Sequence, residues 1–183
     1  MVQGESNGWT RWDTTARSAD WTVANAVETF APLKNDDGEE CGRWLKEESL
    51  NDYPHTVTWV LCNGGVLEGF FAMCSGTLEL ELPRTDPREE IESVQWPCSV
   101  IKWMCRRDGK RPDGTEYDGL PIINHAIYRA KEVATHQGNV ALFIEPSNPV
   151  IAEKLLGQYP FLRRVKEGQL WMPLFDKYEL LTP

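Results

Sequence analysis

The chain has 183 residues, of which 41% are hydrophobic and 10% aromatic, and it carries a formal net charge of −9. This length predicts one domain spanning residues 1–183, and the apolar content is enough for a packed core, which argues against wholesale disorder. The acidic balance disfavours nucleic acid as a partner unless basic side chains gather on one face.

The first half of the chain predicts a strand, two helices and a β-hairpin. Helix starts are indicated by Ser18 or Asp20 and by Asn35, residue types that accept hydrogen bonds from the first helical amides. Asn63-Gly64 is a strong hairpin signal between two β-prone runs. The predicted elements, in order, are a strand at 9–14, a helix ending before Pro32, a helix carrying Cys41 to Glu48, and strands at 56–62 and 67–82.

The second half predicts alternating strands and helices after a charged loop at 83–93. Asn148-Pro149 combines a capping residue with proline at the first helical position. The predicted elements are a strand at 100–105, a helix from Gly119 to about Gln137, a strand at 140–144, a helix after Asn148, and a terminal hairpin of 162–166 and 170–175 across Glu167-Gly168.

The segment between the strand at 100–105 and the long helix is the strongest functional signal. It is polar, contains Gly109 and Gly114, and leads into Gly119 at the expected start of the helix. Amides at a helix start lack intrahelical partners and bind anions, usually phosphate. The expected apolar face of the helix is Ile123, Ala126, Ile127, Ala130, Val133 and Ala134. A plain strand-to-helix turn capped by Asp118 is the alternative.

The element order β-α-α-β-β-β-α-β-α-β-β, taken with these motifs, resembles the GNAT superfamily of N-acyltransferases over almost the whole chain. The resemblance implies an α+β fold with a mixed, mostly antiparallel sheet flanked by helices. It also implies that acyl-CoA lies between the fourth and fifth strands, with its pyrophosphate on a Q/R-x-x-G-x-G/A loop. Residues 116–121 match that loop in position and spacing, and residues 66–73 are similar to a third-strand pattern of toxin-type members.

The resemblance assigns candidate residues to the cofactor. Asn148 resembles an asparagine that follows the fifth strand of the family, and Phe161 resembles a phenylalanine that closes a later segment. The expected cofactor-binding residues are Met104, Cys105, Arg106, Arg111, Gly114, Gly119, Leu120, Pro121 and Asn148. Among the fourth-strand amides, that of Met104 or Cys105 is expected to meet the oxyanion of the tetrahedral intermediate.

Three positions depart from the family pattern. Glu116 replaces the usual arginine or glutamine, and Pro121 replaces the second small residue. Leu156 stands where many members have the tyrosine that protonates the leaving thiolate. Tyr159 is a substitute acid, but it lies about 300° around the helix and roughly 4.5 Å along it, which favours a structural role.

Candidate bases are Glu79 and Glu81, at the end of the third strand, where a carboxylate can deprotonate an amine. The alternative is that Glu79 and Glu81 are simply the solvent-exposed positions of a strand in which polar and apolar residues alternate. The expected activity is acetyl-CoA-dependent (or other acyl-CoA-dependent) N-acylation of a primary amine on a small molecule or protein. The alternatives are a catalytically inactive binding or regulatory module of the same fold, and a toxin-type acetyltransferase acting on aminoacyl-tRNA.

Localisation and assembly follow from weaker signals. The N-terminus shows no signal-peptide pattern, and no run approaches the roughly 20 apolar residues of a membrane span. Five cysteines without a C-x-x-C pair predict reduced thiols and no metal site. We therefore expect a soluble, cytoplasmic protein with no membrane partner, and a homodimer is compatible with the family resemblance.

Overall fold

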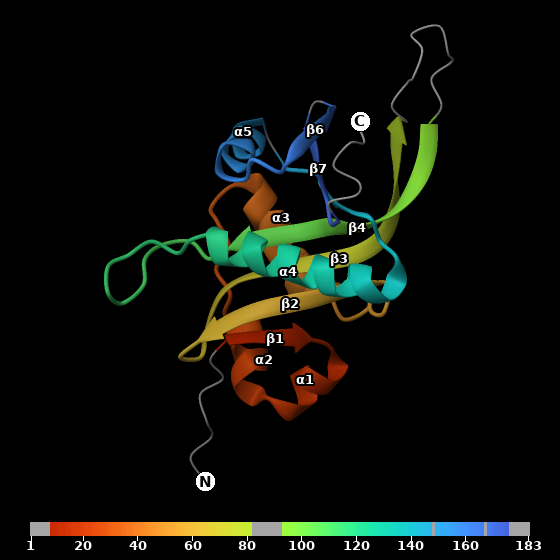
Figure 1. Ribbon diagram of the computed structural model, residues 1–183. Coiled ribbons are helices and arrows are strands. Elements are labelled where there is room, and N and C mark those ends of the chain that lie inside the picture. The colour runs from red at the N-terminus through yellow and green to blue at the C-terminus, as the bar shows by residue number, and fades with distance from the viewer. Residues whose placement is uncertain (1–7, 82–92, 148, 167, 176–183) are drawn as a thin grey trace, which may run out of the picture. The chain divides into compact units, whose positions relative to one another are not determined.

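The computed structural model describes residues 8–81, 93–147, 149–166 and 168–175. Its elements are labelled in Figure 1. In chain order they are β1 (Gly8–Trp12), α1 (Thr14–Ala19), α2 (Trp21–Glu28), α3 (Asp36–Glu47), β2 (Thr56–Asn63), β3 (Val66–Glu81), β4 (Ser93–Arg106), α4 (Leu120–Gln137), β5 (Ala141–Ile144), α5 (Pro149–Gln158), β6 (Arg163–Lys166) and β7 (Gln169–Pro173).

Three helices, α1, α2 and α3, lie between β1 and β2, where the sequence predicted two. The caps at Asp20 and Asn35 are confirmed, since Asp20 Oδ1 accepts from the amide of Thr22 and Asn35 Oδ1 accepts from the amide of Gly38. The extra helix, α1, begins because Asp13 Oδ1 accepts from two further amides. It contains no buried residue, so no apolar periodicity could have revealed it.

The strands form one sheet in the order β1-β2-β3-β4-β5-β7-β6. The β1–β2, β2–β3, β5–β7 and β6–β7 pairs are antiparallel, whereas β4–β5 is parallel. The mixed, mostly antiparallel sheet expected from the sequence is therefore confirmed. The first hairpin turn is shifted by one residue: Asn63 pairs with Val66, and the turn consists of Gly64 and Gly65, whose φ angles are 56° and 73°.

Strand β4 is much longer than predicted. Its first half contains Pro97, a residue that interrupts most strand patterns because it has no backbone donor. Pro97 still contributes its carbonyl, which accepts from the Val140 amide at 2.9 Å. The predicted charged loop at 83–93 lies almost entirely outside the described residues.

The chain divides into two compact units, and β3, β4 and α4 contribute to both. Unit 1 comprises residues 1–74 and 102–126, and unit 2 comprises 75–101 and 127–183. In unit 1, α2 and α3 pack on β2, β3 and the end of β4 around buried Phe70, with Val27 and Leu45 from the two helices. In unit 2, the core contains Trp171 and Cys98, and the Asn139 side chain donates to the buried Ser99 hydroxyl.

Within the described ranges, no helix combines the length and the apolar composition needed to cross a bilayer.

Candidate functional site

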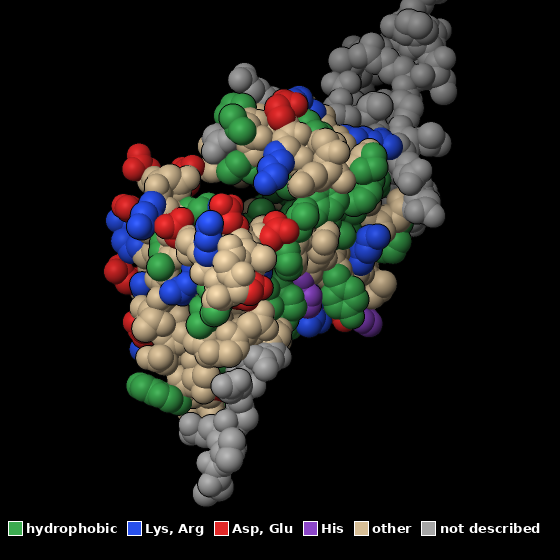
Figure 2. Space-filling model, turned by 90° about the vertical axis from the view of Figure 1, so that its left-hand side faces the viewer, with side chains coloured by type: hydrophobic (Ala, Val, Ile, Leu, Met, Phe, Trp, Pro, Cys, Tyr) green, Lys and Arg blue, Asp and Glu red, His purple; other side chains and the backbone are tan. Residues whose placement is uncertain are grey.

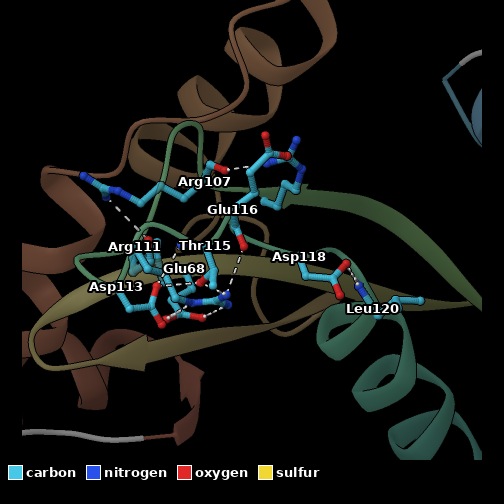
Figure 3. A network of polar contacts seen from close by, with 10 residues as sticks. Glu68, Arg107, Arg111, Asp113, Thr115, Glu116, Asp118 and Leu120 are labelled. Carbon is cyan, nitrogen blue, oxygen red and sulfur yellow. Dashed lines mark hydrogen bonds and ion pairs between the residues drawn. The ribbon is translucent and has the colours of Figure 1, made fainter.

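Residues 107–119 connect β4 to α4, and we refer to them as the β4–α4 loop (Figure 3). The root of this loop is held by two neighbouring segments of unit 1. The Arg107 amide donates to the Glu68 carbonyl at 2.7 Å, and the Asp108 amide donates to the Ala31 carbonyl at 2.9 Å. Strand β3 and the segment before α3 therefore fix where the loop leaves the sheet.

Arg111 is the centre of the polar network in Figure 3. Its Nε and Nη2 donate to the two carboxylate oxygens of Glu68 at 3.1 and 2.8 Å, and its Nη1 donates to the Glu116 carbonyl at 3.0 Å. The guanidinium also lies over the Tyr117 ring, 5.2 Å from its centroid. Paired, fork-like hydrogen bonds between arginine and carboxylate are among the stronger polar contacts in proteins. Arg111 thus braces the loop against β3.

The same pairing changes the acidity of both groups. The Arg111 hydrogen bonds hold the pKa of Glu68 below its ordinary value, against a smaller opposing effect of burial. The carboxylate in turn raises the pKa of Arg111. Both groups are therefore charged at neutral pH.

The tip of the loop is a tight turn. The Arg111 amide donates to the Thr115 carbonyl, and Asp113 Oδ1 accepts from both the amide and the hydroxyl of Thr115. These bonds lower the pKa of Asp113. Gly109 and Gly114 both have φ of 85°, a backbone conformation that requires glycine.

The start of α4 is satisfied by the chain itself. Asp118 Oδ1 accepts from the Leu120 amide at 3.0 Å, Pro121 has no amide hydrogen, and the Gly119 carbonyl accepts from the two residues that follow Pro121. The capping role that the sequence offered for Asp118 is confirmed. An anion at this helix start would compete with the Asp118 carboxylate for the Leu120 amide.

Gly119 has no conformational reason to be glycine. Its φ is not positive, and a Cβ placed on it would meet no atom within 4 Å. The backbone at the helix start therefore faces open space, which a close-approaching phosphate needs.

The end of β4 carries three of the residues predicted to bind the cofactor. Cys105 is buried and Met104 is half-buried. Cys41 of α3 packs against the core cluster that contains Cys105, and Cys105 Sγ donates to the Arg106 carbonyl at 3.3 Å. Arg106 is half-buried and its Nη1 donates to the Arg107 carbonyl at 3.2 Å.

A surface pocket of about 260 Å³ lies beside the end of α3. It is lined by Trp44, Glu48, Asn51, Asp52 and Lys102. Lys102 Nζ is 2.9 Å from Asp52 Oδ2, and this hydrogen bond lowers the pKa of Asp52. Two carboxylates and one ammonium leave the pocket with a net negative charge. These residues and Glu68 lie far apart in the chain and share no motif, so no sequence pattern indicates that they are functional.

The predicted catalytic residues on β3 and after α5 belong to unit 2. Glu79 is exposed, while the Glu81 side chain and Asn148 lie outside the described parts of the structure. Tyr159 is 8% exposed, and its ring lies against Phe161 with 5.6 Å between centroids, in agreement with the structural role expected from its offset. Leu156 is half-buried. Among the described residues, no group of three or more His, Cys, Asp or Glu side chains is arranged to hold a metal ion.

No protein-family model matches the chain, and no curated protein matches it significantly. Solved structures do match. A point mutant of the AtaT toxin superposes with a TM-score of 0.67 at 18% identity, covering 95% of this chain and 94% of that chain. A point mutant of KacT gives 0.64 at 18% identity, covering 92% and 96%. AtaT in complex with acetyl-methionyl-tRNAfMet gives 0.62 at 15% identity, covering 80% and 86%. The chain therefore has the GNAT fold, the fold of these toxins.

Proposed function

With the GNAT fold as the premise, we propose that the protein is an acetyl-CoA-dependent N-acetyltransferase whose acceptor is a primary amine. The observation that carries this proposal is the β4–α4 loop. Arg111 and Glu68 hold it against β3, and it ends at Gly119, where no atom lies within 4 Å of the position a Cβ would take. The AtaTR complex has been solved with acetyl-CoA bound, which supports the same cofactor here.

Several residues of this chain fit the cofactor. The backbone at Gly119 would meet the pyrophosphate, the Leu120 amide would join it by exchanging its bond to Asp118, and Pro121 would shape the start of α4 without adding a donor. Arg106 and Lys110 would supply positive charge, whereas Arg111 and Gly114 would shape the loop. Asn148 keeps its proposed place beside the cofactor. When bound, acetyl-CoA supplies an activated acyl carbonyl.

The backbone of β4 would stabilise the oxyanion that forms during acyl transfer. The Met104 or Cys105 amide would meet the oxyanion of the tetrahedral intermediate. Glu79 and Glu81 remain the candidate bases of this proposal. The reaction needs little else from side chains if the reactants are held in line.

The acceptor site that the geometry supports is the pocket beside α3. An ammonium group suits its net negative charge. A small cationic amine fits this pocket better than a polyanion.

Cofactor binding tests the proposal. Acetyl-CoA at about 100 times its Kd should stabilise the protein by roughly 2.7 kcal/mol, seen as a rise in Tm. Gly119→Val should lower the affinity at least tenfold by calorimetry, because the added side chain occupies the open space at the helix start. Gly157→Val is the matched control, since its Cβ also meets no atom within 4 Å. The absence of a Tm rise at millimolar acetyl-CoA or CoA would refute the proposal.

A second candidate is acetylation of aminoacyl-tRNA, favoured by the AtaT complex with acetyl-methionyl-tRNAfMet. Figure 2 shows one face of the molecule on which acidic and basic side chains are interspersed rather than separated into a basic patch. This arrangement, together with the net charge of −9, supports the small amine over tRNA.

A third candidate is a binding module without catalysis. It is favoured by Leu156 and by the Asp118 carboxylate at the start of α4. Binding of CoA without turnover of any amine would select it.

A further inference from the structure

The pocket beside α3 lies shortly before the end of β4. Lys102, which lines it, precedes Met104 and Cys105 by two and three positions on the same strand. Trp44, another lining residue, is 4% exposed and stacks on the Trp103 ring with 5.4 Å between centroids. The pocket is therefore packed against β4 at positions 102 and 103, and all of these residues belong to unit 1.

The negative charge of the pocket comes from two carboxylates. Asp52 Oδ2 lies 2.9 Å from Lys102 Nζ, and this hydrogen bond lowers the pKa of Asp52, so the carboxylate is ionised at neutral pH. The two charges of this pair cancel. Glu48, exposed at the end of α3, adds the second carboxylate. One ammonium group in the pocket would therefore balance its charge.

An ammonium group held in this pocket is not the nitrogen that becomes acetylated. An alkyl ammonium has a pKa of about 10.4, and a neighbouring carboxylate raises it, so the held nitrogen stays protonated and has no lone pair for attack. The reacting centre is also distant. A strand rises about 3.3 Å per residue, which places the Lys102 backbone roughly 7 to 10 Å from the Met104 and Cys105 amides. An acceptor held in the pocket therefore needs a second nitrogen.

On the basis of the proposed function, we propose that the acceptor is a linear diamine with an amine at each end. The pocket holds one end as an ammonium ion, and the other end reacts at the end of β4. The neutral nitrogen attacks the thioester carbon, a C–N bond forms, the C–S bond breaks, and the proton lost from nitrogen ends on the CoA thiol. An extended carbon chain advances about 1.25 Å per bond, so roughly four to seven methylene groups span the gap.

Acetyl transfer by the full chain tests this assignment with two acceptors of equal length. Hexylamine has a methyl group where linear diaminopentane has its second nitrogen. With labelled acetyl-CoA, kcat/KM should be about tenfold higher for diaminopentane, because hexylamine cannot make the charge-assisted contacts of the pocket. Mass spectrometry should show one acetyl group on each product molecule, since a second transfer would place an uncharged acetamide in the acidic pocket.

Variants of the two carboxylates test whether the pocket causes this preference. Asp52→Asn and Glu48→Gln each remove one negative charge from the pocket lining, and each should reduce the preference to less than about threefold. Glu47→Gln is the matched control, since Glu47 is exposed next to Glu48 in the chain but is not part of the lining, and it should retain the preference.

Equal kcat/KM for the two acceptors, or a doubly acetylated product, would overturn the inference and leave the proposed acetyltransferase in place. Failure to bind acetyl-CoA would instead count against the proposed function. Calorimetry with diaminopentane alone still tests the pocket in that case, because Asp52→Asn should weaken its binding at least threefold. Equal affinity of wild type and variant for the diamine would then contradict the inference.

Discussion

Glu68 is the residue through which strand β3 holds the β4–α4 loop. Its side chain is 11% exposed, and it accepts two of the hydrogen bonds that Arg111 donates. We predict that Glu68→Gln lowers the free energy of unfolding by about 1.5 kcal/mol, because hydrogen bonds to charged groups contribute about that much. Denaturant unfolding measures it. Glu153→Gln, which breaks the more exposed pair with Arg164, should cost less than about 0.5 kcal/mol.

The contribution of Glu68 should depend on pH. Its pKa is lower in the folded chain than in the unfolded one, so the stabilisation is fully present above the ordinary carboxyl pKa of about 4.3 and is lost as pH falls through the folded value. We therefore expect the difference between wild type and Glu68→Gln to be constant from pH 6 to 7 and to shrink below about pH 4. A difference that grows in acid would contradict the assigned pairing.

Tyr159 is predicted to be structural. Its buried ring packs against Phe161 after the end of α5. Tyr159→Phe keeps this packing and should change turnover less than about threefold, since a proton-transfer group tolerates only about 0.5 Å of displacement. A hundredfold loss of kcat at unchanged acetyl-CoA affinity would make Tyr159 the general acid.

At the scale of elements, helix α4 begins with an acidic side chain where the cofactor's pyrophosphate is proposed to bind. Asparagine caps helices as well as aspartate does, so Asp118→Asn keeps an acceptor for the Leu120 amide and removes the charge. We predict that CoA binds about fivefold more tightly to this variant, as a charge near a helix end contributes up to about 1 kcal/mol. Asp113→Asn, in the same loop but bonded to Thr115, is the control and should change Kd less than twofold.

At the scale of the whole molecule, the acidic charge selects between acceptors. We predict acetyl transfer from labelled acetyl-CoA to small cationic amines, with Asp52→Asn raising KM for the amine at least threefold and leaving acetyl-CoA affinity unchanged. Under the same conditions, aminoacyl-tRNA should be a poor acceptor, because a protein of net charge −9 repels a polyanion. Efficient labelling of aminoacyl-tRNA would favour the function suggested by the AtaT complex.

The sequence by itself determined the features whose physical cause is local. Asp20 and Asn35 cap helices through amides two or three residues away, and the apolar spacing of α4 predicted buried Ile123 and Ala126. These interactions form within one turn of chain, so neighbouring residue types suffice to indicate them. The element order, and with it the resemblance to the GNAT fold, follows from such signals. Helix α1 escaped detection because it buries nothing.

Only the tertiary structure decided which distant residues meet. Arg111 reaches Glu68 across 43 positions, and Lys102 reaches Asp52 across 50. Such pairs depend on strand register and helix packing, which no local pattern specifies. From the sequence alone, Arg111 was expected to bind the cofactor. In the structure its hydrogen bonds to Glu68 on β3 hold the β4–α4 loop in place. The fold therefore decided which charged residues pair with one another.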